Sequence, residues 1–184
     1  MSVRILALVG SLRAGSHNRQ LADAAVKHAP EGVEIVLHEG LADVPYYNED
    51  IDVEGNVPAA AAALRAATAQ ADALLLFSPE YNGTMPAVLK NAIDWLSRPY
   101  GVAALKEKPV AVIGTAFGQF GGVWAQDEAR KAVGIAGGHV IEGATLSIPG
   151  SVTRFAETHP GDDAEVVDGL TKVFEQIVQA DSAA

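Results

Sequence analysis

The chain has 184 residues, 49% of them hydrophobic, which is enough for one domain with a sizeable core but too little for two full domains. Its formal net charge of −10 argues against a nucleic acid or an anionic membrane as partner, because either would favour a basic face. The absence of cysteine excludes disulfides, thiolate catalysis and Cys-ligated metal clusters.

Apolar runs alternate with helical patterns along the chain. The predicted strands are Val3–Val9, Val33–His38, Ala73–Ser78, Pro109–Thr115 and His139–Ser147. The predicted helices are His17–Ala29, Val57–Ala71, Pro86–Arg98, Phe120–Ala136 and Asp163–Ala180. This alternation predicts an α/β fold in which a five-stranded parallel sheet is covered by helices on both faces. A single run of five units favours the strand order 2-1-3-4-5 and one domain over residues 1–184, and other orders stay open at this point.

The loop after the first strand carries donors suited to a phosphate. Gly10–Arg19 leads into the first helix, whose free N–H groups and dipole attract an anion. Its side chains add hydroxyl, amide and guanidinium donors, on Ser11, Arg13, Ser16, Asn18 and Arg19. The loop matches neither the Walker pattern nor the dinucleotide fingerprint, so we predict one terminal phosphate, as in a mononucleotide. The alternative is that Ser16 or Asn18 only caps the helix.

A long acidic connection, residues 39–56, follows the second strand. It contains several carboxylates and two aromatic rings, on Asp43, Tyr46, Tyr47, Glu49, Asp50, Asp52 and Glu54. Long loops in a compact domain are often functional. The same expectation applies to a second long connection, residues 148–162. A solvated acidic surface is an equally good interpretation, so the role of residues 39–56 stays open.

The loop after the third strand is the most informative segment. Pro79–Pro86 places one aromatic ring, one amide, one glycine and one hydroxyl between a buried strand and a helix. Open α/β sheets bind ligands at the carboxyl ends of their strands, and this chemistry suits a flat ring with polar edges. We expect Gly83 to matter because it lacks a Cβ and because it adopts φ > 0. Glu80 is a weak candidate for a general base, since a lone loop glutamate more often holds backbone N–H groups.

A third loop, Thr115–Gly122, follows the fourth strand. Its glycines would let backbone amides approach a ligand ring, or they serve only for a turn and its packing. In a parallel sheet all three loops converge on one edge. The five histidines show no metal-ligand spacing, and no nucleophile elbow is present, so we expect neither a metal site nor a hydrolase.

Together these motifs resemble the NAD(P)H-dependent FMN reductase family, which includes quinone, azo-dye and chromate reductases. The resemblance covers about residues 3–150 and implies a flavodoxin-like three-layer sandwich. Its strongest motifs are Gly10-Ser11-Leu12-Arg13 with Ser16 and Asn18-Arg19, and Pro79-Glu80-Tyr81-Asn82-Gly83 with Leu89-Lys90-Asn91-Ala92-Ile93-Asp94-Trp95. Tyr46–Asp50 resembles the family as well, whereas Thr84 and Ala87 stand where many members carry Ser and Gly.

The resemblance implies an FMN site built by three loops. Around the phosphate it implies Ser11, Arg13, Ser16, His17 and Asn18. Along the isoalloxazine ring it implies Pro79, Glu80, Tyr81, Asn82 and Gly83. On the other side of the ring it implies residues of the third loop, among them Thr115, Gly118 and Gly121. It implies no catalytic side chain, because FMN itself carries hydride from NADPH or NADH to a small acceptor such as a quinone, free flavin, azo compound or metal oxyanion.

Two rival functions stay open. A flavodoxin-type FMN electron carrier would serve a protein partner, and a regulatory module would bind a nucleotide without flavin. The loops that carry Arg13 and Pro79–Gly83 favour the reductase, whereas the acidic surface permits a carrier. The resemblance also implies a homodimer or homotetramer. Neither a secretion signal nor a membrane-spanning stretch is visible, so we expect a cytoplasmic protein without a membrane partner. The physiological acceptor and the preference between NADH and NADPH are not predicted.

Overall fold

The computed structural model describes residues 2–182 and contains a five-stranded parallel sheet. The strands are β1 (Val3–Val9), β2 (Val33–Leu37), β3 (Ala73–Phe77), β4 (Pro109–Thr115) and β5 (His139–Ile148). They lie in the order β2-β1-β3-β4-β5, and every pairing is parallel. All residues of β3 and β4 are buried, as expected for central strands covered on both faces. The predicted strand order is confirmed.

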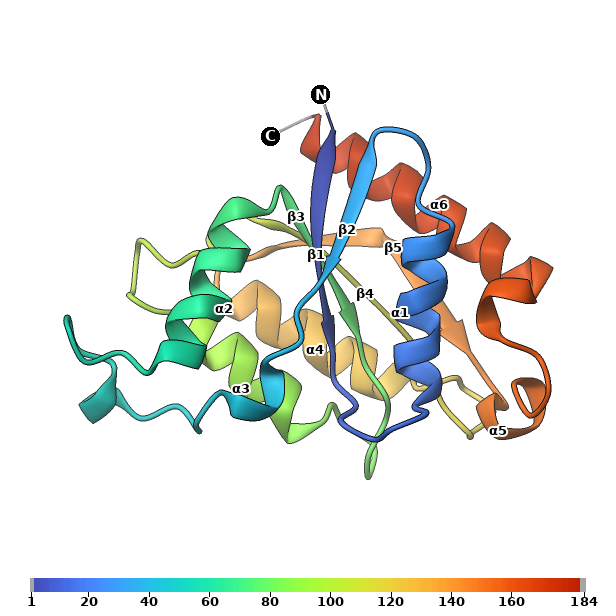
Figure 1. The fold of residues 1–184 in the computed structure, drawn as a ribbon, viewed down its shortest axis with the longest axis horizontal. Coiled ribbons are helices and arrows are strands. Elements are labelled where there is room, and N and C mark those ends of the chain that lie inside the picture. Colours follow the sequence, from blue (N-terminus) through green and yellow to red (C-terminus); the bar gives the residue numbers. More distant parts are fainter. Residues whose placement is uncertain (1, 183–184) are drawn as a thin grey trace.

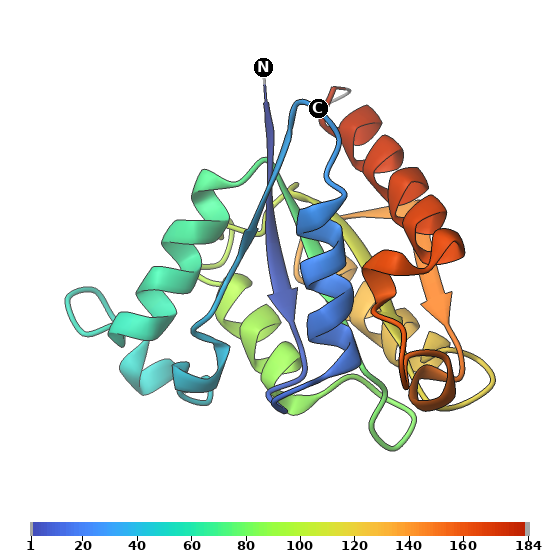
Figure 2. The same ribbon diagram turned by 45° about the vertical axis from the view of Figure 1, so that its right-hand side comes forward.

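Helices cover both faces of this sheet (Figures 1 and 2). They are α1 (His17–Lys27), α2 (Ala59–Gln70), α3 (Ala87–Leu96), α4 (Val123–Ile135), α5 (Ser151–Arg154) and α6 (Ala164–Asp181). Successive strand residues point to opposite faces, so Ile5, Ala7 and Val9 pack with α1 and α6, whereas Leu6 and Leu8 pack with α2, α3 and α4. The two apolar cores give the predicted three-layer sandwich. Within residues 2–182, no helix is both long and apolar enough to cross a membrane.

The helix predicted over Phe120–Ala136 begins at Val123 in the structure, three residues after the predicted start. Gly122 precedes α4 with a φ of +83°, a left-handed conformation that does not continue into a helix toward the N-terminus. Phe120 therefore belongs to the loop between β4 and α4. The two connections predicted as irregular also contain short helices, namely α5 and the 3₁₀ turns Leu41–Asp43, Glu49–Ile51 and Pro160–Asp162.

The acidic connection is anchored to α2 and α3. Asp52 is nearly buried and accepts two hydrogen bonds from Arg65, of 2.6 and 2.7 Å. The Arg65 guanidinium also lies 5.1 Å from the centroid of the Trp95 ring. Trp95 donates its indole N–H to the carbonyl of Pro45 at 2.7 Å. Asn91 accepts the N–H of Tyr47 at 2.8 Å, so the segment Leu89–Trp95 on α3 holds this connection in place. The backbone of this connection is therefore anchored, while Asp43, Glu49, Asp50 and Glu54 are exposed, as the interpretation of a solvated acidic surface expects.

The Asp52–Arg65 pair makes stability depend on pH. Its hydrogen bonds hold the pKa of Asp52 below the ordinary value of 3.8, so the stabilisation is complete above that value and is lost as the pH falls below it. We expect Asp52→Asn to lower the free energy of unfolding by about 1–3 kcal/mol at pH 7. The difference between variant and wild type should shrink at pH 3, where Asp52 in the unfolded chain is protonated. Urea unfolding at both pH values measures it.

Glu128→Gln is the matched control. Glu128 is 51% exposed and lies 4.0 Å from Lys131, which is 68% exposed, on the surface of α4, where an ion pair contributes little. Its effect should stay below about 0.5 kcal/mol at pH 7. A destabilisation by Asp52→Asn that is the same at both pH values would contradict a role for the charged pair.

Candidate functional site

The three predicted loops meet at the carboxyl edge of β1, β3 and β4, at the lower side of the molecule in Figure 1. Direct contacts join them. Ser11 Oγ of the first loop lies 3.4 Å from Tyr81 Oη of the second loop. Glu80 of the second loop accepts the backbone N–H of Ala125, in the first turn of α4, at 3.3 Å. The expected convergence is therefore confirmed.

Arg13 is the exposed cation of the first loop. Its guanidinium donates to the carbonyl of the adjacent Ala14 at 3.3 Å. Arg19, by contrast, binds Glu39 through two bonds of 2.8 and 2.7 Å and Asp23 through a third. These partners raise the pKa of Arg19 and neutralise its charge. Of the two arginines proposed as phosphate ligands, the structure therefore favours Arg13.

Ser16 caps α1. Its Oγ accepts the backbone N–H of Arg19 at 3.4 Å, which confirms the capping alternative for this residue. Within residues 2–182, the backbone N–H groups of His17 and Asn18 have no acceptor. Two donors at the positive end of the helix dipole are thus open to an anion beside Arg13.

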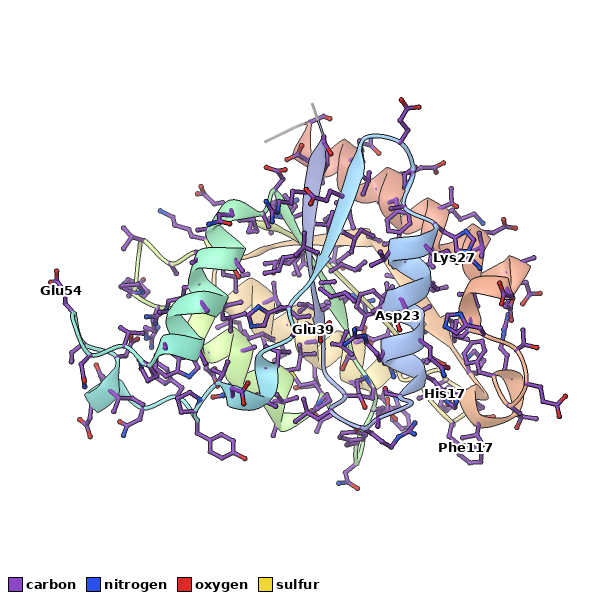
Figure 3. All side chains as sticks on the ribbon, viewed as in Figure 1. His17, Asp23, Lys27, Glu39, Glu54 and Phe117 are labelled. Carbon is purple, nitrogen blue, oxygen red and sulfur yellow. The ribbon has the colours of Figure 1, made fainter. Side chains whose placement is uncertain are left out.

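The positively charged form of His17 is disfavoured at this site. Burial lowers the pKa of His17 below 6.5, and the positive charge of Arg13 lowers it further. The imidazole packs edge-on against the ring of Phe155, with a centroid separation of 5.8 Å. Figure 3 places His17 at the end of α1 that faces the sheet edge. Arg13 is consequently the main source of positive charge for a phosphate.

Asn18 connects the first loop to the third. Its side chain is buried, donates to the carbonyl of Thr115 at 2.9 Å and accepts the N–H of Thr115 at 3.0 Å. The Thr115 hydroxyl donates to the carbonyl of Ile148 at 2.8 Å. Both side chains, predicted as ligand contacts, are therefore engaged inside the protein, and they fix the loops relative to each other.

The second loop is a tight hairpin. Tyr81 and Thr84 exchange two backbone hydrogen bonds, of 3.0 and 3.2 Å, across Asn82 and Gly83. Asn82 has a φ of +54° and Gly83 a φ of +78°, the pattern of a type I′ turn that Asn-Gly favours. The expected φ > 0 at Gly83 is confirmed. A Cβ there would meet nothing within 4 Å, so the protein alone leaves room for it.

The loop ends are packed closely. A Cβ on Gly10 would lie 3.2 Å from Pro79 and Pro86, and one on Gly121 would lie 2.7 Å from the backbone of Ile148. Gly121 therefore serves packing against β5, the alternative foreseen for this loop, whereas Gly118 has open space around it. The interpretation of Glu80 as a holder of backbone N–H groups is confirmed by its bond to Ala125.

Gln126 was missed by the sequence reasoning. It is fully buried, donates to the carbonyl of Gly121 at 3.1 Å and accepts the hydroxyl of Ser147 at 2.7 Å. These bonds fix the third loop to β5. The available signal was a glutamine among the apolar positions of a helix.

A cavity of about 360 Å³ lies beside the first loop, between Arg13 and Glu39. Larger hollows lie elsewhere, of about 600 Å³ between α4 and β5 and about 380 Å³ between α3 and α4. Volume alone does not define a site. Polar groups converge at the carboxyl edge of β1, β3 and β4, which we call the loop edge, and this convergence marks it as the candidate site. Among residues 2–182, no group of three acidic or histidine side chains is arranged to hold a metal ion.

The family model for NADPH-dependent FMN reductases matches residues 3–153. The chain belongs to this family. It is 42% identical over 130 residues to the 2-hydroxy-1,4-benzoquinone reductase of Burkholderia sp, a match that covers 71% of this chain and 69% of the relative. It is 39% identical over 129 residues to a quinone reductase of Escherichia coli K12, covering 70% and 68%. The predicted family is confirmed.

Solved structures of flavoenzymes share the fold of this chain. The flavoenzyme NAD(P)H:(acceptor) oxidoreductase FerB from Paracoccus denitrificans superposes with a TM-score of 0.79 at 28% identity, covering 96% of this chain and 98% of FerB. The apo form of the NADH:FMN oxidoreductase EMOB gives a TM-score of 0.68 at 22% identity, covering 99% and 90%, and supports the fold alone. The flavodoxin-like fold prediction is confirmed.

Proposed function

We propose that this member of the FMN reductase family binds FMN at the loop edge and passes hydride from NADPH or NADH to a small acceptor of the quinone class. One observation carries the proposal: Arg13, which has no carboxylate partner among residues 2–182, lies with two open helix N–H groups at the same sheet edge as the Asn-Gly hairpin. The arginine and the helix N–H groups suit a phosphate, and the hairpin suits a ring.

The first loop fits the phosphate of FMN. A phosphate monoester carries about −1.5 to −2 charges near pH 7, which matches Arg13 together with the N–H groups of His17 and Asn18. The net charge of −10 does not oppose this binding, because exposed charges more than about 8 Å away are largely screened at physiological salt. Ser11 adds a hydroxyl between this region and Tyr81.

The hairpin fits the ring. Pro79–Gly83 offers a backbone edge and the half-exposed ring of Tyr81. FMN, when bound, supplies the hydride chemistry, so the protein must bind, orient and exclude water. Glu80 is bonded to α4, and Asn18 is bonded to Thr115, so these side chains position the loops and need not transfer protons.

Anaerobic mixing with reduced nicotinamide tests the proposal. The protein reconstituted with FMN should lose its visible flavin absorbance when NADPH or NADH is added, and a quinone should restore it. A flavodoxin-type carrier would keep its colour with both nicotinamides. A protein that takes up no FMN at all would instead support the regulatory module. Either result would contradict the reductase.

We further propose that residues 1–184 form one FMN-binding domain that acts in the cytoplasm as a homodimer or homotetramer. Large apolar side chains exposed away from the loop edge support assembly, among them Tyr100 and Val102. Light scattering should give a multiple of the 19.1 kDa chain mass. A mass of one chain at micromolar concentration would contradict the oligomer.

A further inference from the structure

The exposed phenylalanine and tryptophan rings lie in one segment of the chain, whereas the exposed tyrosines Tyr46, Tyr81 and Tyr100 lie elsewhere. Of five phenylalanines and two tryptophans, four are buried in the cores, namely Phe77, Trp95, Phe155 and Phe174. The other three are Phe117, Phe120 and Trp124, which are 73, 54 and 55% exposed. All three lie between the end of β4 and the first turn of α4. We refer to these three residues as the aromatic patch.

The patch is held beside the ring-side hairpin. Glu80 of the second loop accepts the N–H of Ala125, the residue directly after Trp124. Gln126 fixes the carbonyl of Gly121, directly after Phe120. Ala116, directly before Phe117, donates its N–H to the carbonyl of Ile148 in β5 and accepts the N–H of Ser151 in α5. Figure 3 shows Phe117 at the same sheet edge as His17. The backbone beneath the rings is thus anchored at three points next to the proposed flavin site.

The patch is too small for a stable subunit interface by itself. A Phe or Trp side chain buries about 150–250 Å², so the exposed fractions amount to roughly 400 Å². A specific protein–protein interface needs about 800 Å² from each partner. Patches of roughly 300–600 Å² on a monomer are often functional. The size therefore favours a small aromatic ligand over a second copy of the chain.

We propose that Phe120 and Trp124 bind the electron acceptor and select fused-ring quinones over single-ring quinones. The inference rests on the proposed function. The two ring centroids are 5.5 Å apart and the ring planes are inclined by 45°. A flat acceptor that stacks parallel to one ring is inclined by the same 45° to the other ring and lies within reach of both. A fused two-ring acceptor is long enough to contact both rings, whereas a single ring makes good contact with one.

The test compares two acceptors in the FMN-loaded protein, 2-methyl-1,4-naphthoquinone and 1,4-benzoquinone. The quantity measured is the ratio of their kcat/KM values. Phe120→Ala and Trp124→Ala should each lower this ratio by about 10-fold, through a higher KM for the naphthoquinone. Trp124→Phe keeps a ring and should restore most of the ratio. Ile135→Ala, which removes an exposed side chain at the far end of α4, should leave the ratio unchanged.

Three results would overturn the acceptor platform. The first is an unchanged ratio in both alanine variants. The second is an equal loss in Ile135→Ala. The third is a change of mass in light scattering of the alanine variants, which would assign the patch to a subunit contact. Failure of the proposed function is recognised separately, because the flavin of the wild-type protein would then keep its colour with NADPH and NADH.

Discussion

Replacing Gly83 by valine is expected to weaken FMN binding by at least about 100-fold while the fold survives. Gly83 has a φ of +78°, which a β-branched residue strongly resists, so the hairpin must change its shape. A flat ring packed on this backbone would also clash with the new side chain. The hairpin lies outside both apolar cores, so the cost to overall stability should be only about 1–3 kcal/mol. FMN titration and urea unfolding measure the two effects.

Gly32→Val is the matched control for this variant. Gly32 has a φ of +82°, and a Cβ there also meets nothing within 4 Å. It precedes β2 and therefore lies at the amino edge of the parallel sheet, opposite the loops. We expect a similar loss of stability and unchanged FMN affinity. Wild-type affinity and turnover in Gly83→Val would show that Pro79–Gly83 does not form the ring site.

Arg13→Ala should weaken FMN binding by roughly 1.5–3 kcal/mol, about 10- to 150-fold, the usual scale for a hydrogen bond to a charged group. Arg13 has no carboxylate partner in the part of the chain that the structure describes, so its removal leaves the phosphate with N–H donors alone. The rate of flavin reduction per bound FMN should change much less, because the phosphate lies away from the reacting ring. Titration and rapid-mixing absorbance separate the two quantities.

Lys27→Ala removes the same charge from the other end of α1 and serves as the control. Lys27 pairs with Asp162 and lies about ten residues, or roughly 15 Å, along the helix from the open amides. That distance exceeds the screening length at physiological salt, so FMN affinity should stay within about twofold. If Arg13→Ala and the wild type bind FMN with equal affinity, the first loop caps α1 and does not bind the phosphate.

The sheet could be predicted because local sequence determines it. The unbroken apolar runs of β3 and β4 indicate buried central strands, and their alternation with helices implies parallel pairing. The convergence of the loops followed from this topology alone. The left-handed Gly83 was predictable because only glycine adopts that conformation readily, and the Asn-Gly pair before Thr84 already indicates the hairpin.

The contacts that hold the site could not be predicted in the same way. Asn18 and Thr115 are 97 residues apart, and nothing in either local sequence indicates that their polar groups satisfy each other. The same holds for Gln126 with Ser147. Phe120 fitted a helical pattern, but the left-handed backbone of Gly122 leaves it in the loop with its ring exposed. Long-range satisfaction of buried polar groups depends on the folded structure.

A crystal structure of the protein with FMN is the most direct test of the central claim, that one sheet edge binds both ends of this cofactor. We predict the phosphate within hydrogen-bond distance of Arg13 and of the N–H groups of His17 and Asn18. We predict the ring against Tyr81–Gly83, on the side of the hairpin that faces the start of α4. A phosphate bound elsewhere, or a ring that does not contact the hairpin, would contradict the account.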